Sequence, residues 1–265
     1  MKQQQVGKAI ILSAGRGGRL LPLTAELPKC LLPVDADRPV LELQLRMLAQ
    51  CGIQRVTVMV GFGAKKVERF LATHPIENLE VHTRYNPFFR TTNTLVTCWL
   101  AIPEMTKDFM LLNGDTLFEA EVLRRVLTSH KGPVTLAIDQ KAVYDHDDMK
   151  AVLGSGGQLK AVGKVLAAPR IDGESIGLMV FRDKGVEAFR AALDAAIRDH
   201  ANLRKWYHDV ISTMAGSLLV ETELIEGLWW TEIDTPKDLA NARAYFARER
   251  TAPERLTVFS PVGDA

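Results

Sequence analysis

The segment 9–20 most constrains how this chain can fold. It opens with an uninterrupted apolar run, and Gly15, Gly17 and Gly18 follow within a few positions. Short apolar runs of this kind are typical of strands buried on both faces of a parallel sheet. Glycine has no Cβ and reaches positive φ without strain, so such a loop lets backbone N–H groups approach an anion closely. With the added charge of Arg19, the segment predicts a strand that ends in a polyphosphate-binding loop.

This loop is neither of the two common phosphate-binding loops. Leu20 stands where the dinucleotide fingerprint requires a third glycine, and the Walker pattern of glycine, four residues and Gly-Lys-Ser/Thr is missing. Lys29 follows, with Pro28 and Pro33 stiffening the chain on either side. We therefore expect a phosphate site of a different kind, with a lysine on a rigid tether.

The first half of the chain alternates strand-like and helix-like segments. Hydrophobic periodicity and helix-end signals predict strands at 9–12, 55–60, 79–83, 109–113 and 134–138, and helices at 39–51, 64–73, 93–101 and 120–129. This rhythm favours an α/β fold of the Rossmann-like class, a mostly parallel sheet sandwiched by helices. Ligands of such sheets bind at the carboxyl ends of the strands, where the glycine-rich loop is expected to lie.

In the second half of the chain the regular alternation of strands and helices ends. Its patterns predict a hairpin of strands 149–153 and 158–162, strands at 175–181, 217–220 and 228–230, and helices at 184–197, 203–214 and 236–247. We expect a single domain over 1–247. It would have a core at about 7–140, a smaller mixed β/α substrate-binding lid at about 141–230, and a C-terminal tail at 248–265.

Composition excludes several classes of protein. With 47% hydrophobic residues the 265-residue chain can bury a large core, and its net charge of +1 provides no global field for nucleic acid. No apolar run approaches the length of a membrane span, and the polar start lacks the apolar core of a signal peptide. Cys30, Cys51 and Cys98 form no CxxC pair. We expect a cytoplasmic protein without nucleic-acid or membrane partners, and leave open a homo-oligomer.

Two acids follow strand-like segments. Asp115 ends the string Asn113-Gly114-Asp115 directly after a buried strand, at the sheet edge where the glycine-rich loop should also lie, and Asp234 precedes the last helix. From the pattern alone, Asp115 is either a metal ligand or a turn former. Asp234 is either a metal ligand or the N-cap of the helix.

The whole string from Leu12 to Leu31 resembles the signature of the nucleotidyltransferases that make NDP-sugars and CDP-alcohols. That signature runs Leu-Ala-Ala-Gly-x-Gly-Thr-Arg-Leu-x-Pro-Leu-Thr, a spacer, then Pro-Lys-x-Leu. Ser13 and Gly18 depart from it, small residue for small residue. The matching positions are Leu12, Ala14, Gly15, Gly17, Arg19, Leu20, Pro22, Leu23, Thr24, Pro28, Lys29 and Leu31. The resemblance spans about residues 7–247 and implies the GT-A-like fold of this family and its nucleotidyl transfer from an NTP.

The resemblance also implies roles for individual residues. Asp115 and Asp234 match the positions where the family holds Mg²⁺, with Asp238 as a looser candidate. Arg19 would hold the β- and γ-phosphates and Lys29 the α-phosphate, as the catalytic groups. The nucleotide-binding residues that it implies are Leu12, Ala14, Gly15, Gly17, Gly18, Arg19, Lys29, Tyr85, Thr92 and Asn93. Thr94 stands where the family has a second asparagine.

The chemistry explains why no catalytic base is evident. A phosphomonoester has a second pKa near 6, so at neutral pH it is mostly dianionic and already a nucleophile. The chain has no clear Ser/His/Asp or Cys/His arrangement. What the reaction requires is alignment and charge neutralisation while pyrophosphate leaves.

The acceptor is less constrained. Four strings resemble segments of bacterial phosphocholine cytidylyltransferases: Tyr85-Asn86-Pro87, Thr92-Asn93-Thr94-Leu95, Asp148-Met149-Lys150 and Gly173-Glu174-Ser175-Ile176-Gly177. This resemblance implies CTP as the nucleotide and an acceptor such as phosphocholine. Candidate acceptor-binding residues are Lys164, Glu174, Trp206, Tyr207, Asp209 and Trp230. Aromatic faces bind quaternary ammonium groups, but the same aromatic residues also fit a hydrophobic core, and Lys164 also fits an ordinary exposed lysine at a strand end.

Other functions stay open. A sugar-1-phosphate nucleotidyltransferase using UTP or dTTP, or an inositol- or polyol-phosphate cytidylyltransferase, would share the loop, Lys29 and Asp115. A non-catalytic relative would be expected to lack Arg19, Lys29 or Asp115, and the chain has all three.

Overall fold

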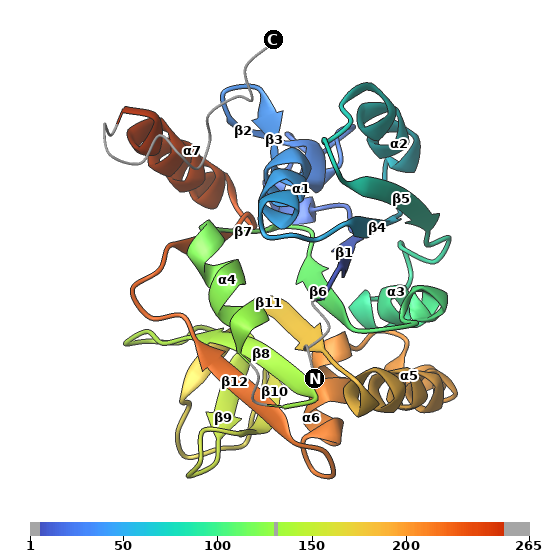
Figure 1. Ribbon diagram of the computed structural model, residues 1–265, viewed down its shortest axis with the longest axis vertical. Coiled ribbons are helices and arrows are strands. Elements are labelled where there is room, and N and C mark those ends of the chain that lie inside the picture. Colours follow the sequence, from blue (N-terminus) through green and yellow to red (C-terminus); the bar gives the residue numbers. More distant parts are fainter. Residues whose placement is uncertain (1–5, 130–131, 252–265) are drawn as a thin grey trace.

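The computed structural model describes residues 6–129 and 132–251. Figure 1 shows a central sheet with helices packed on both of its faces. The strands are β1 (Lys8–Ser13), β2 (Pro33–Asp35), β3 (Arg38–Pro39), β4 (Arg55–Val60), β5 (Glu80–Tyr85), β6 (Phe109–Asn113), β7 (Thr116–Phe118), β8 (Val134–Asp139), β9 (Lys150–Leu153), β10 (Leu159–Gly163), β11 (Gly173–Phe181), β12 (Val220–Leu224) and β13 (Trp230–Glu232). The helices are α1 (Val40–Gln50), α2 (Ala64–Thr73), α3 (Thr94–Leu100), α4 (Ala120–Thr128), α5 (Lys184–Ile197), α6 (Tyr207–Met214) and α7 (Pro236–Thr251). Short 3₁₀ turns lie at Gly18–Leu20, Lys29–Leu31, Ile102–Glu104 and His200–Asn202.

The main sheet joins a parallel half to an antiparallel half. Strands β6, β1, β4 and β5 are parallel neighbours, and β11 pairs antiparallel with β6, β8 and β9. The hairpin β9–β10 therefore continues the same sheet, and β12 adds parallel to β8. The α/β class with a Rossmann-like sheet is confirmed, and the segment expected to form a lid is hydrogen-bonded to the core sheet.

Strand β1 is buried on both faces, as its apolar run predicts. Ala9 and Ile11 pack on one side with α1, α2 and α4, whereas Ile10 and Leu12 pack on the other with α3, α5 and α6. A third cluster joins α7 to the region around β2 and β7. The alternation of a strand places successive side chains on opposite faces, so β1 stabilises both layers at once.

The carboxyl ends of the parallel strands position the site. Strands β1, β4 and β6 point the same way, so the loops after Ser13, Val60 and Asn113 meet at one edge. Gly114 N donates to Leu12 O at 3.0 Å, and Phe62 N donates to Ala14 O at 3.0 Å, which tie these loops together. The expected meeting of the glycine-rich loop and the strand before Asp115 is thus confirmed.

Several boundaries differ from expectation. The helix predicted at 203–214 begins only at Tyr207, because the segment before it forms turns and Asp209 caps the helix by accepting the N–H of Trp206. The strands predicted at 217–220 and 228–230 lie further along, as β12 and β13. Helix α7 extends to Thr251, so the first part of the expected tail is helical, and residues 252–265 lie outside the described ranges.

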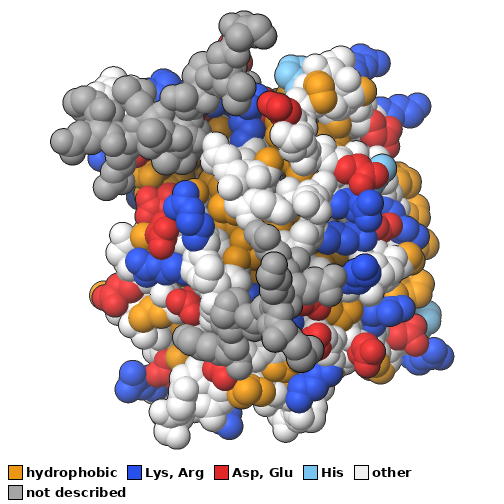
Figure 2. Space-filling model, in the orientation of Figure 1, with side chains coloured by type: hydrophobic (Ala, Val, Ile, Leu, Met, Phe, Trp, Pro, Cys, Tyr) orange, Lys and Arg blue, Asp and Glu red, His pale blue; other side chains and the backbone are white. Residues whose placement is uncertain are grey.

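The surface agrees with the near-neutral composition. Acidic and basic side chains are interspersed over the face shown in Figure 2. In the described ranges no helix is both long and apolar enough to cross a membrane.

Candidate active site

Two adjoining cavities lie at this edge of the sheet. The first, here the loop cavity, has a volume of about 410 Å³ and lies against the glycine-rich loop. The second, the side cavity, has a volume of about 220 Å³ and extends toward the second half of the chain. Leu12, Arg19, Asp115 and Asp234 line both. The charged groups therefore stand where two ligands could meet.

The loop is held in shape by glycine and by the lysine that follows it. Gly17 adopts a left-handed φ of 70°, and a Cβ at this position would lie 3.1 Å from Lys29 Cβ. Thr24 is buried and donates to Gly17 O at 2.7 Å, which closes the loop on itself. Packing of the Lys29 stem against Gly17 fixes where its ammonium can reach.

Asp115 is brought close by a second glycine. At Gly114 a Cβ would lie 1.9 Å from Ser13 Oγ, so only glycine lets β6 continue past the end of β1. Ser13, Cys30 and Gly114 complete the lining of the loop cavity and were not predicted as site residues. The asparagine-glycine-aspartate order was the signal that could have included Gly114.

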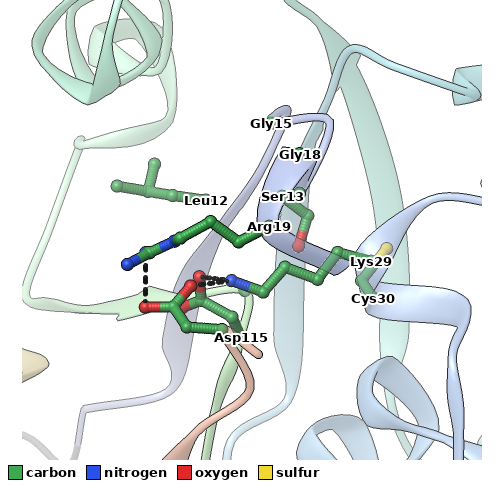
Figure 3. A pocket seen from close by; sticks show the side chains of 11 residues that line it. Leu12, Ser13, Gly15, Gly18, Arg19, Lys29, Cys30 and Asp115 are labelled. Carbon is green, nitrogen blue, oxygen red and sulfur yellow. Dashed lines mark hydrogen bonds and ion pairs between the residues drawn. The ribbon is translucent and has the colours of Figure 1, made fainter. Parts of the chain in front are cut away.

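Lys29 lies between two carboxylates. Its Nζ donates to Asp115 Oδ2 at 2.7 Å and to Asp234 Oδ1 at 2.5 Å. Figure 3 shows the Lys29 side chain extending toward Asp115. Burial lowers the pKa of Lys29, but the two carboxylates outweigh it and raise that pKa above the ordinary value. Burial raises the pKa of Asp234, yet Lys29 and Arg19 hold it below its ordinary value. The lysine and Asp234 are therefore both charged.

Arg19 links the loop to two acids. It lies 2.7 Å from Asp234 Oδ2 and forms an ion pair with Asp147, in the segment between β8 and β9. Asp147 also pairs with Lys164, 2.5 Å away. Asp147 was not predicted as a site residue, and its place directly before Asp148-Met149-Lys150 was the available signal. Arg19, expected to bind the nucleotide phosphates, and Lys164, expected to bind the acceptor, thus share one carboxylate.

The side cavity contains part of the expected acceptor site. Lys164, Trp206 and Tyr207 line it, and Lys164 Nζ lies 5.0 Å from the centre of the Trp206 ring. Asn93 also lines this cavity, although it was expected to bind the nucleotide, and its side chain caps α3 by accepting the N–H of Thr94.

Glu232 is an unexpected member of this wall. It lies two residues before Asp234 and lines the side cavity. Burial, with the nearby charges of Asp115 and Asp234, raises the pKa of Glu232 to about 8. Its place in the Trp-Thr-Glu-Ile-Asp string was the available signal. Asn113, Ser175 and His208 are further members that the sequence analysis did not single out.

Three candidates for the acceptor site lie elsewhere. Trp230 donates its indole N–H to Asp139 Oδ2 at 2.7 Å and packs against the core. Asp209 caps α6. Glu174 pairs with Lys141 at 3.0 Å. None of Trp230, Asp209 and Glu174 lines either cavity, and each has a partner within the fold.

Three nucleotide candidates are likewise absent from the cavity walls. Ala14 is buried, Tyr85 is exposed at the end of β5, and Thr92 donates its hydroxyl to Phe88 O at 2.8 Å. Leu12, Gly15, Gly17, Gly18, Arg19 and Lys29 line the loop cavity as expected.

Asp238 serves the helix rather than the site. Its Oδ2 accepts the N–H of Thr235 at 2.7 Å, while Asp238 N lies 3.3 Å from Thr235 Oγ1. This reciprocal pair is a capping box at the start of α7. Thr235 therefore caps the helix, which leaves the Asp234 carboxylate directed at Lys29 and Arg19.

The two carboxylates that meet at Lys29 form a donor set that fits Mg²⁺. Asp115 and Asp234 both reach one ammonium group, and hard carboxylate oxygens with phosphate oxygens and water are what this ion prefers. No group of three or more His, Cys, Asp or Glu side chains suited to a metal occurs in the described part of the chain.

Comparison with known proteins places this site in a family. A family model described as nucleotidyl transferase matches residues 8–145. The chain is 27% identical over 245 residues to the bifunctional IPC transferase and DIPP synthase of Aquifex aeolicus, covering 92% of this chain and 52% of that protein. The chain thus spans about half the length of that relative.

Two solved structures share the fold. The inositol-1-phosphate CTP transferase from T. maritima superposes with a TM-score of 0.77 at 19% identity, covering 93% of this chain and 97% of that one. The CTP:phosphocholine cytidylyltransferase from Streptococcus pneumoniae superposes with a TM-score of 0.70 at 20% identity, covering 91% and 99%. Because the family model matches more than half of the chain and includes the loop, Lys29 and Asp115, the chain belongs to the nucleotidyl transferase family.

Proposed function

We propose that this chain transfers a cytidylyl group from CTP to the phosphate of a small phosphorylated alcohol, releasing pyrophosphate. The observation that carries the proposal is the shared wall of the two cavities, where Arg19, Asp115 and Asp234 face both. A nucleotide in the loop cavity and a phosphate in the side cavity would meet at these groups. Both structural neighbours described above are named for CTP.

The chain's own residues would act by binding and alignment. Backbone N–H groups of the loop and Arg19 would hold the β- and γ-phosphates, and Lys29 the α-phosphate. An oxygen of the acceptor phosphate would bond to the α-phosphorus while the bond to the β-phosphate oxygen breaks, so pyrophosphate leaves with that electron pair. Positioning and electrostatic stabilisation supply most of the catalysis in such reactions.

Asp115 and Asp234 would hold a Mg²⁺ ion. When bound, the ion would supply charge neutralisation to the phosphates. The two carboxylates now balance Lys29 and Arg19, so a cation that takes their charge would free both basic side chains to contact phosphate.

The side cavity would receive the acceptor. Lys164 enters it from residues 141–230, the part of the chain expected to bind the acceptor, and residues of the expected nucleotide-binding part at 7–140 line it as well. Asp147 holds Lys164 and Arg19 in place. An acceptor phosphate would compete with this carboxylate for the same cations. Phosphocholine is one candidate acceptor, and inositol, polyol or sugar phosphates are the others.

Pyrophosphate release across CTP, UTP, dTTP and ATP, each with a set of phosphorylated alcohols and Mg²⁺, tests this function. CTP is expected to give the highest turnover. The same protein carrying Lys29→Ala is the blank for contaminating activity. A preference for UTP or dTTP with sugar 1-phosphates would replace the cytidylyl assignment. An absence of release in every combination would overturn the function.

A further inference from the structure

The aromatic rings of the side cavity already have partners. Trp206 lies under the Lys164 ammonium, 5.0 Å from its ring centre. Tyr207 is fully buried, its ring centre lies 4.0 Å from that of His208, and its hydroxyl donates to Asn113 Oδ1 at 3.2 Å. A trimethylammonium group gains its binding energy from open ring faces. At Trp206 it would compete with the Lys164 ammonium for the ring face that this ammonium covers.

A bulge in β11 delivers a polar group to the same cavity. The register of β11 against β8 shifts between Ser175 and Met179, and Gly177 within it has a φ of 72°. A Cβ on Gly177 would lie 2.2 Å from Asn113 Nδ2, so the Asn113 amide occupies the space beside the bulge. Bulges next to active sites re-aim a side chain, and here Ser175 lines the cavity.

Ser175 is paired with a buried histidine. Ser175 Oγ lies 3.2 Å from His208 Nε2 and accepts the N–H of Gly177 at 3.2 Å. Ser175 and His208 are 4% and 3% exposed, and both line the side cavity. The bulge in β11 with Gly177 positions Ser175, and the start of α6 positions His208. The pair is therefore held by two separate elements of the fold.

Ser175 and His208 form a neutral pair that can still make further hydrogen bonds. Burial, with a contribution from Lys164, lowers the pKa of His208 to about 3, so the ring is uncharged at neutral pH. Its Nδ1 has no hydrogen-bond partner among the residues that the structure describes. A neutral imidazole and a hydroxyl each donate and accept. Together they suit an acceptor hydroxyl and offer no charge to attract a quaternary ammonium.

We propose that Ser175 and His208 recognise a hydroxyl group on the alcohol part of the acceptor, which makes the acceptor a phosphorylated polyol or sugar rather than phosphocholine. The inference rests on the proposed function. The physical reason is that the methyl groups of phosphocholine cannot form hydrogen bonds. Placed against Ser175 and His208, they would leave these buried polar groups without partners, and a site built to bind a hydroxyl strongly rejects a substrate that lacks one.

Acceptor kinetics at saturating CTP and Mg²⁺ test the proposal. The substrates are myo-inositol 1-phosphate, glycerol 3-phosphate and phosphocholine, and the variants are Ser175→Ala, Ser175→Thr and His208→Phe. The wild type is expected to use a hydroxylated acceptor with a kcat/KM at least about 10-fold above that for phosphocholine. Ser175→Ala should raise the KM for that acceptor about 10-fold and leave the KM for CTP unchanged, and Ser175→Thr, which keeps the hydroxyl, should recover part of the loss.

Ser217→Ala is the matched control, because the Ser217 hydroxyl donates to Met214 O and this residue lines neither cavity. Should His208→Phe fail to fold, Ser175→Ala alone decides. Preferred use of phosphocholine, or an equal loss with all acceptors in Ser175→Ala, would overturn the inference and leave nucleotidyl transfer standing. No pyrophosphate release with any acceptor would instead remove the proposed function itself, and the inference with it.

Discussion

Lys29 and Asp234 lie 205 positions apart in the sequence, and the fold brings Lys29 Nζ to 2.5 Å from Asp234 Oδ1. Strand β13 makes this possible by pairing antiparallel with β7, which places the segment before α7 beside Asp115. Ile233 N donates to Asp115 O at 2.9 Å and secures the approach. The acidic pair therefore exists only when the end of the chain has returned to the sheet edge where its beginning lies.

Replacing either acid by its amide should lower turnover strongly without unfolding the protein. Asp115→Asn and Asp234→Asn keep the side-chain shape and remove one charge, so turnover is expected to fall by about 100-fold or more while the melting temperature changes little. Asp37→Asn, at an exposed position, is the control. Rates equal to wild type in both variants would contradict the metal assignment.

Lys29 should act mainly on the transition state. Lys29→Ala removes the charge proposed to contact the α-phosphate, so kcat is expected to fall by about 100-fold or more, with a much smaller rise in the nucleotide KM. Steady-state kinetics measures both parameters, and Lys65→Ala, exposed on α2, controls for loss of a lysine. If affinity falls while kcat holds, Lys29 is only an anchor.

His208 should make the fold sensitive to acid. Its ordinary pKa of 6.5 in the unfolded chain falls to about 3 in the fold, so between these values protons bind the unfolded state preferentially. The contribution of neutral His208 to the free energy of unfolding is therefore complete above pH 6.5 and is lost progressively as the pH falls toward 3. Urea unfolding at several pH values should show a shallower decline in His208→Phe than in wild type. His200→Gln, at an exposed position, should follow wild type, and equal slopes in all three proteins would refute the shift.

Substitutions of Trp206 and Trp230 should have different effects, one on acceptor binding and the other on stability. Trp230→Leu loses the hydrogen bond to Asp139 and part of its core packing, so its melting temperature should drop. The free-energy cost should stay below the roughly 3–5 kcal/mol of a Trp→Ala replacement in a core. Trp206→Leu removes the ring under Lys164 and should raise the acceptor KM with a smaller loss of stability. Thermal melts and acceptor kinetics check the pair, and a reversed pattern would place Trp230 at the acceptor.

Two glycines with similar φ values separate the cost of a contact with Asn113 from the cost of a side chain at positive φ. Gly177→Ala and Gly157→Ala both place a side chain at positive φ, at 72° and 79°, which costs about 1 kcal/mol. Only at Gly177 would the new methyl meet the Asn113 amide. Gly177→Ala should therefore destabilise by a further 1–3 kcal/mol or so and also weaken acceptor use. Equal unfolding free energies for the two variants would show that the Asn113 amide can move aside.

The local patterns of the sequence determined the parallel half of the fold. Residues 9–12 are apolar without interruption because β1 is buried on both faces, and the alternation up to 138 reflects strands and helices whose packing depends on near neighbours. The meeting of the loop with the strand before Asp115 could be predicted for the same reason, since Gly17 and Gly114 are required by contacts that are local or between adjacent strands. The roles expected of Lys29 and Asp115 came instead from the resemblance to the family signature.

Only the tertiary structure decided what each polar or aromatic side chain faces. Asp234 and Asp238 stand in one string, yet the first reaches Lys29 and the second completes the capping box of α7. Trp206 lines the side cavity, whereas Trp230 is engaged by Asp139. The sequence pattern specifies which residues can be buried or charged, but the partner of each depends on strand pairings that join positions over a hundred residues apart. Those pairings are set by the packing of the whole chain.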